Sequence, residues 1–452
     1  MSNNINLKQG LNIPISGTAA QKTRKDVAGT VVAIKPTDFK GLLPKLLVKE
    51  GDRVLAGSPV LADKVSQDIL FTSPVSGTVG SVVRGEKRKL LEVRIKADKT
   101  TEYVDFGTRK VNELSAEQVR EALLQSGLWP SFIQRPYGIV ADPQIKPKAI
   151  FVSAFATAPL AADIDYTLRD EFDNIQTGVN AVAKLTDGGV HFSLNGVNFN
   201  GTPLHKIENV IHHTFTGKHP AGNVGVQIHH ISPVSKGETV WTISPMMLAA
   251  IGKLFNTGKY DVSRKVAVTG PKAIDPAYVT AFPGMSMTDI ADFYDNSAND
   301  IRFISGDVLT GTNVGAEGFL GFFDNQVTLI KEGNEYEMFG WAKPFRTNLF
   351  SASRTYFSWL TPNKKYDMDT NLHGSPRAFV MSDLYGKVLP MDLYPVHLVK
   401  ACLAGDIDKM EKFGIYEVIE EDLALCEYVC PSKIEIQSIL SDGINLMLKE
   451  MA

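Results

Sequence analysis

One stretch near the middle of the chain, residues 217–258, constrains the fold more than any other. A loop of glycine and proline opens it, and apolar residues then recur at helical spacing over residues 221–231. Pro220 stands where the first turn of a helix tolerates proline. β-Branched and aromatic residues follow at 239–243, and a second helical pattern over 246–255 ends at a glycine. This order of loop, helix, strand and helix predicts an α/β unit.

The same stretch leaves two interpretations open. A glycine loop before a helix can bind nucleotide phosphates, because free backbone amides point outward there. The stretch contains neither GxGxxG nor the Walker lysine motif, so a packed α/β unit without a ligand fits equally well. Five of the nine histidines also lie here or just before it, at His212, His213, His219, His229 and His230. Because no cysteine or carboxylate stands beside them at zinc-site spacing, we expect no metal site.

Bulk properties exclude several classes of function. A chain of 452 residues suggests about three domains. The net charge of −3 argues against nucleic-acid binding, which needs a basic surface. No apolar run reaches the ~18–20 residues of a membrane helix, and the first residues lack the pattern of a signal peptide. Three cysteines without a disulfide framework are typical of a cytoplasmic protein.

Residues 29–94 read as short β-strands separated by glycine turns. Within them, residues 48–83 resemble the biotinyl/lipoyl hammerhead pattern, GDxVxxGxxL followed by aPvxGxV. A working carrier holds a lysine at the hairpin tip, whereas here the tip falls at 66–68 and Lys64 is displaced from it. We therefore expect a hammerhead that serves as a scaffold and carries no covalent group.

An aromatic loop follows the first predicted helix. Ser115 and Gln118 form a capping box, and the helix is expected to end at Gly127. The next residues, GLWPSFIQRPYGIV, bring four large side chains together in a loop with two prolines. These side chains are Trp129, Phe132, Arg135 and Tyr137. They suit a flat ligand ring such as a quinone, and they equally suit packing of the loop against the core.

The rest of the chain divides into three further patterns. Residues 149–154 form a buried strand, and alternating strands and helices from there to 255 predict a three-layer α/β, Rossmann-like core. Residues 265–290 look like a β-grasp module of the soluble ligand-binding type, continued by strands at 303–309 and 326–330. The pattern is irregular after Lys331, and helices are expected from Tyr394 onward. They are predicted at 395–403, 407–413, 420–428 and 434–449.

Two cysteines stand in the last of these segments, in LALCEYVCPSK. Cys426, Cys430 and Pro431 match the end of the iron–sulfur pattern C-x2-C-x2-C-x3-C-P. The first two cysteine positions hold Glu420 and Leu423 instead. Two thiolates cannot hold a four-iron cluster, so we interpret the pair as the remnant of a lost site, with a redox dithiol as the weaker alternative.

Longer words point to a family. GLNIPISGTAAQ, SGLWPSFIQRPY, HPAGNVG, ISGDVLTG, EMFGWAKP and EEDLALCEYVCPSK resemble the NqrA family of the Na⁺-translocating NADH:quinone reductase, over essentially the whole chain. More distantly, the order of modules resembles the NADH- and flavin-binding subunit of respiratory complex I and its Rnf relatives. The flavin loop of complex I is glycine-rich, whereas Trp129 to Phe132 here are bulky, and its acidic strand end is replaced by Ser153 to Thr157.

The resemblance implies a multidomain α+β protein in four parts. These are a biotinyl/lipoyl-like domain at 1–100, the α/β core at 101–260, the β-grasp module at 261–335, and a linker with helical bundle at 336–452. It implies a peripheral subunit on the cytoplasmic face of the bacterial inner membrane, with five partner subunits, in a pump that oxidises NADH, reduces ubiquinone or menaquinone and exports Na⁺. The NqrA family is associated with the quinone-reducing end. We expect no flavin, NADH site or cluster in this chain; a stand-alone flavin or NADH diaphorase is the alternative.

Overall fold

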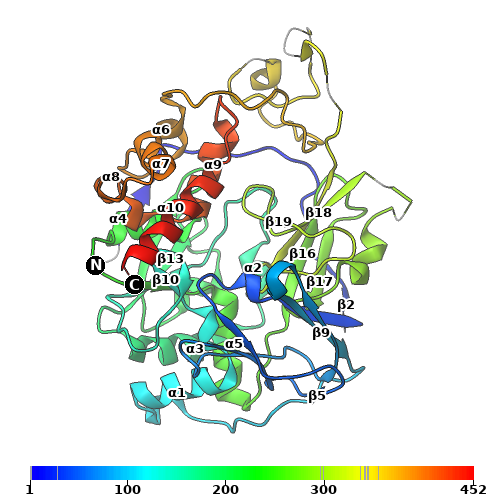
Figure 1. The fold of residues 1–452 in the computed structure, drawn as a ribbon, viewed down its shortest axis with the longest axis vertical. Helices are drawn as coiled ribbons and strands as arrows, with labels where there is room; N and C mark the ends of the chain where they lie inside the picture. Colours follow the sequence, from blue (N-terminus) through cyan, green and yellow to red (C-terminus); the bar gives the residue numbers. More distant parts are fainter. Residues whose placement is uncertain are drawn as a thin grey trace.

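The computed structural model describes residues 3–451 except 28, 296, 299, 336, 341, 342, 344, 345 and 355. A sheet of seven strands forms its centre, in the order β1-β14-β13-β12-β15-β10-β11 (Figure 1). Its strands are β1 (Asn4–Asn6), β10 (Ile133–Arg135), β11 (Ile139–Val140), β12 (Ile150–Ser153), β13 (Val190–Asn195), β14 (Ile211–Thr216) and β15 (Val240–Thr242). The strands β1, β14, β13, β12 and β15 run parallel, and β10 and β11 add an antiparallel edge.

Helices cover both faces of this sheet, as the alternation along β12 requires. Ile150 and Val152 pack into the core shared with α3 (Phe172–Val182) and α5 (Pro245–Thr257), whereas Phe151 faces α4 (Val224–Ile231). The expected α/β core is therefore present. One detail of the prediction is wrong: α4 begins after its N-cap Asn223, not at Pro220, because the loop before it hydrogen-bonds elsewhere.

Two smaller sheets form the first domain. The first has the order β3-β9-β8-β5 and the second β4-β6-β7. Their strands are β3 (Val31–Ile34), β4 (Pro44–Leu46), β5 (Arg53–Val54), β6 (Pro59–Asp63), β7 (Leu70–Thr72), β8 (Gly77–Arg84) and β9 (Leu90–Ala97). The predicted hairpin tip lies between β6 and β7, and Lys64 is exposed there.

A six-stranded sheet forms the third domain, in the order β19-β18-β20-β16-β17-β2. Its strands are β2 (Thr23–Asp26), β16 (Arg264–Thr269), β17 (Ala277–Ala281), β18 (Ile301–Ser305), β19 (Thr312–Asn313) and β20 (Gln326–Lys331). The helix expected near Ser286 is the 3-10 helix η7 (Met287–Phe293), and Ser286 caps it. Apolar residues of β16, β17, β20 and η7 form a separate core.

Helices complete the chain at both sides of the central sheet. The remaining α-helices are α1 (Ala116–Ser126), α2 (Ile164–Leu168), α6 (Leu384–Val388), α7 (Pro395–Ala404), α8 (Ile407–Lys412), α9 (Glu420–Val429) and α10 (Ile436–Met451). The four C-terminal helices α7 to α10 were predicted within a few residues, and α6 was missed in the segment expected to be irregular. These helices share a core with Leu7, Phe155 and Phe215 of the α/β domain.

The first 26 residues belong to two sheets that the later chain builds. β1 pairs with β14 in the central sheet, and β2 pairs with β17 in the third domain. The segment between them contacts the chain near Tyr366, where Ile15 forms a β-bridge. The domain boundaries at residues 100, 260 and 335 stay predictions, but the N-terminal segment clearly ties the domains to one another. Among the described residues, no helix is both long and apolar enough to cross a bilayer.

Candidate functional site

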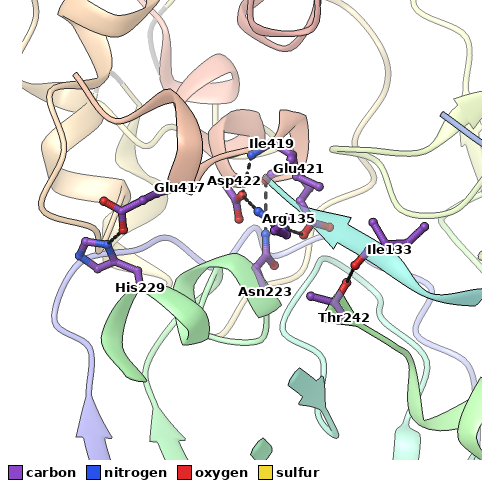
Figure 2. A network of polar contacts seen from close by, with 9 residues as sticks. All are labelled: Ile133, Arg135, Asn223, His229, Thr242, Glu417, Ile419, Glu421 and Asp422. Carbon is purple, nitrogen blue, oxygen red and sulfur yellow. Dashed lines mark hydrogen bonds and ion pairs between the residues drawn. The ribbon is translucent and has the colours of Figure 1, made fainter. Parts of the chain in front are cut away.

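Arg135 brings the predicted aromatic loop into contact with the C-terminal helices. It is the last residue of β10, and its side chain leaves the edge of the sheet toward the start of α9 (Figure 2). Only 2% of Arg135 is exposed. Its guanidinium donates to Asp422 Oδ2 at 2.5 Å and to Glu421 Oε1 at 2.6 Å. The loop therefore meets residues that lie almost 300 positions later in the sequence.

These carboxylates fix the charge of Arg135. Burial by itself lowers the pKa of Arg135, but the charges of Asp422 and Glu421 outweigh it and raise this pKa above its ordinary value. Asp422 is also buried, and its Oδ2 accepts the backbone N–H of Ile419 at 2.9 Å, which caps α9. Burial raises the pKa of Glu421, while the 37% exposure of its side chain moderates this effect. The cluster is a neutralised interdomain ion pair.

The same cluster occupies the N-terminus of α4, where a nucleotide phosphate was one of the two interpretations. A Cβ atom built on Gly225 would lie 2.2 Å from Asp422 Oδ1, so the backbone of α4 approaches the carboxylate directly. Asn223 Nδ2 donates to the carbonyl of Glu421 at 3.3 Å, and Gly222 N–H donates to Thr157 at 2.9 Å. A carboxylate of the chain itself thus takes the place that an anionic ligand would need.

The other predicted loop residues pack against the core. Trp129 and Phe132 are fully buried, and Trp129 Nε1 donates to the carbonyl of Ala141 at 2.8 Å. The ring of Trp129 packs edge-on against Trp241 of β15, with 5.3 Å between ring centroids. Tyr137 is half-buried and lies 6.2 Å from the ring of Tyr416. The four predicted side chains therefore share a loop but do not converge on one cavity.

An apolar cleft lies beside that loop, between the first three domains. Gly127 and Pro130 line it, but Trp129 and Phe132 do not. Its walls are mainly apolar and aromatic, from Ile34, Phe39, Phe71, Tyr260, Pro283 and Phe322, with Lys35, Asp38 and Thr72 as polar groups. The space out to its mouth is about 400 Å³, while its closed interior has room for only about 20 Å³.

The polar groups of this cleft are a lysine and a buried acid. Lys35 Nζ lies 3.3 Å from Asp38 Oδ1 and donates to the carbonyl of Phe319 at 3.1 Å. Burial raises the pKa of Asp38, although Lys35 opposes this rise. Burial also raises the pKa of Tyr260 to about 12, so its hydroxyl stays protonated. The cleft thus combines flat apolar walls with hydrogen-bond donors, a combination that the sequence pattern did not indicate.

The cysteines and histidines form no ligand set. Cys426 and Cys430 are buried free thiols, and Tyr385 Oη donates to Cys430 Sγ at 3.0 Å. His191 and His213 hydrogen-bond each other at 2.8 Å, and His229 contacts Glu417 at 2.6 Å (Figure 2). Within the described part of the chain, no three histidine, cysteine or acidic side chains are grouped to hold a metal ion.

Three family descriptions match successive parts of the chain. Residues 5–98 match the "NqrA N-terminal barrel-sandwich hybrid domain", residues 114–260 the "NqrA second alpha/beta domain", and residues 265–316 the "NQRA C-terminal domain" of the SLBB type. Together with the C-terminal helices, these define the chain as a multidomain α/β protein with a barrel-sandwich hybrid domain, an α/β domain and an SLBB domain.

Full-length relatives give the particular family. The chain is 38% identical to the NqrA-type subunit of the Na(+)-translocating NADH-quinone reductase of Rhodopirellula baltica, covering 98% of each chain. It is 37% identical to the protein of the same name from Yersinia pestis bv. Antiqua, covering 99% of this chain and 100% of the relative. The chain belongs to the NqrA family, whose members are subunits of the Na⁺-translocating NADH-quinone reductase, as its sequence words indicated.

One solved structure shows a weak likeness, from which we draw nothing. It is the "Crystal structure of NAD+-reducing [NiFe]-hydrogenase in the air-oxidized state", with 10% sequence identity and a TM-score of 0.38. The alignment covers 76% of this chain and 62% of that one.

Proposed function

We propose that the chain is a peripheral subunit on the cytoplasmic face of its membrane complex, that it works beside five partner subunits, and that it contributes to the quinone-reducing end. Its membership in the NqrA family supports the first part. The observation that carries the quinone part is the apolar cleft beside the aromatic loop, because flat walls with a few fixed donors are what a quinone ring requires.

Within this proposal the ring enters the mouth of the cleft. Phe39 and Phe322 supply flat apolar surface there, and Lys35 supplies an N–H donor for a carbonyl oxygen. The closed interior is too small for a ring, so the cleft must widen on binding. Trp129, Phe132, Arg135 and Tyr137, which the sequence nominated for this role, support the cleft from behind its lining loop.

We also propose that this chain binds no flavin, NADH or iron–sulfur cluster of its own. The support is positive: Asp422 occupies the N-terminus of α4, and Tyr385 donates to Cys430 inside an apolar core. Purified chain that carried near-stoichiometric flavin absorbance would instead favour the stand-alone diaphorase.

The quinone proposal is tested by titrating the isolated chain with a short-tailed ubiquinone in a calorimeter. The double variant Lys35→Met/Asp38→Asn removes the donor and keeps the cleft neutral, and we expect it to weaken affinity about tenfold. Lys45→Met, on an exposed strand, is the matched control and should bind normally. The same titration on Arg135→Met separates the two sites: a loss of affinity there, with the Lys35 variant unchanged, would assign the ring to the aromatic loop and reject the cleft.

A further inference from the structure

Residues 337–365 form a part of the surface that differs from the rest. We call it the basic lobe. Five of the eighteen large apolar side chains that are exposed among the described residues lie in it. They are Met338, Phe339, Phe357, Trp359 and Leu360, with exposed fractions between 50% and 80%. Trp359 and Leu360 stand together at the end of the 3-10 helix η9 (Phe357–Leu360).

The charge of the basic lobe is opposite to that of the molecule. It contains two arginines and three lysines against one acid, Glu337, for a net charge of +4. The whole chain carries −3, so the remaining residues carry −7. Arg354 and Lys365 are exposed, and neither forms an ion pair with any described residue. An anionic surface would therefore attract this lobe and repel the rest of the protein.

Internal contacts hold the basic lobe together. Glu337 pairs with Lys343 and with Arg346, at 2.5 Å for the latter, and the Arg346 guanidinium lies 5.5 Å from the ring centre of Tyr356. Lys364 Nζ donates to the carbonyl of Thr347 at 2.6 Å. In Figure 1 this gold segment projects at the top, beyond the strand β18 and the helix α9. The apolar side chains are thus presented by an ordered, projecting structure.

We propose that the basic lobe binds the surface of an anionic lipid bilayer, with Trp359 and Leu360 inserted at headgroup level and the lysines and arginines paired with lipid phosphates. Aromatic residues concentrate at membrane–water interfaces. Each lysine or arginine near an anionic leaflet contributes about 1 kcal/mol of attraction. A membrane-anchored partner protein is the rival occupant. Lysine is depleted at protein interfaces, and three lysines among these exposed apolar groups favour lipid.

This inference deepens the proposed peripheral placement and is independent of the quinone cleft. It is tested with the full chain and protein-free vesicles of phosphatidylcholine, alone or with about one third phosphatidylglycerol, by flotation. We expect the chain to float with the anionic vesicles at low salt only, and to be released by about 0.5 M NaCl. Because no other protein of the complex is present in the vesicles, failure to float leaves membership of the complex untouched.

Two lobe variants separate the electrostatic and apolar contributions. Arg354→Glu/Lys365→Glu should reduce binding to anionic vesicles by about tenfold or more. Trp359→Ser/Leu360→Ser should reduce binding at low salt while leaving its salt dependence. The matched controls change equally exposed residues elsewhere: Lys64→Glu/Lys99→Glu for charge, and Val197→Ser for apolar surface. Both controls should float like the unchanged chain.

Two results would overturn the proposal. The first is an absence of flotation with anionic vesicles at low salt, and the second is equal flotation of the lobe variants and their controls. A companion measurement uses membranes that hold the other subunits but lack this one. If the lobe variants fail to bind only there, the basic lobe docks onto a protein and the lipid assignment is wrong.

Discussion

Arg135 illustrates how one residue ties two domains together. Its guanidinium and the Asp422 carboxylate are both buried, so either group alone would be an uncompensated charge. We expect Arg135→Met to lower the free energy of unfolding by about 3–5 kcal/mol, measured by denaturant titration.

A double-mutant cycle checks that the ion pair causes this loss. Asp422→Asn keeps an oxygen that can accept the Ile419 N–H but removes the charge. The double variant Arg135→Met/Asp422→Asn should therefore be more stable than the sum of the two single losses implies, by about 1–3 kcal/mol. Additive losses would show that Arg135 acts through packing alone.

Buried neutral histidines make stability depend on pH at the same scale. His219 is 3% exposed, and burial lowers its pKa from 6.5 to about 4. Between these values the unfolded chain binds a proton that the folded chain does not, so stability falls as the pH drops from about 6.5 toward 4.

The variant His219→Asn tests this origin of the acid sensitivity, because Asn can keep the contact with Thr157 and does not titrate. The loss of unfolding free energy between pH 7 and pH 5 should shrink by about 2 kcal/mol in the variant. His191 and His213, whose pKa values burial also lowers to about 4, retain their share. An unchanged difference would assign the acid sensitivity to other groups.

At the scale of elements, two glycines set the packing of α3 against α5. A Cβ on Gly178 would lie 2.0 Å from the carbonyl oxygen of Leu248, and one on Gly252 would lie 1.8 Å from that of Asn174. Although alanine favours a helix over glycine by about 1 kcal/mol, Gly252→Ala must separate the helices. We expect it to lower the melting temperature, with a loss of about 2 kcal/mol.

Gly386→Ala in α6 is the matched control, because nothing lies within 4 Å of a Cβ there. It should leave stability unchanged or raise it by up to about 1 kcal/mol. If both variants behaved alike, the close approach of α3 and α5 would not limit the sequence.

Local signals predicted the elements that local signals control. The capping box of Ser115 and Gln118 and the left-handed Gly127 bound α1 as expected, and Gly258 ends α5. The helix α6, only five residues long, leaves too short a pattern to detect. The partners of Arg135 lie almost 300 residues away, so no local pattern could distinguish a quinone contact from an interdomain ion pair. The cleft, likewise, exists only once three domains meet.

At the scale of the whole molecule, the N-terminal segment holds the domains to one another. Removing residues 1–9 deletes β1 and Leu7, which is buried in the core of the C-terminal helices. We expect a loss of about 3 kcal/mol, from one buried leucine and several hydrogen bonds, seen as a lower melting temperature. Asn4→Ala, which removes only the exposed side-chain contact with Thr214, should change little. Equal stability of the truncated chain would show that β1 is dispensable.

The placement of β1 and β2 also sets an order of events during synthesis. The ribosome makes residues 4–26 first, but their sheet partners, β14 and β17, emerge about 200 and 250 residues later. Until then the leading segment has no partner strand, while the first domain can already close its own two sheets. The earliest residues to be translated are therefore among the last to be placed, and the chain is fastened by its own beginning.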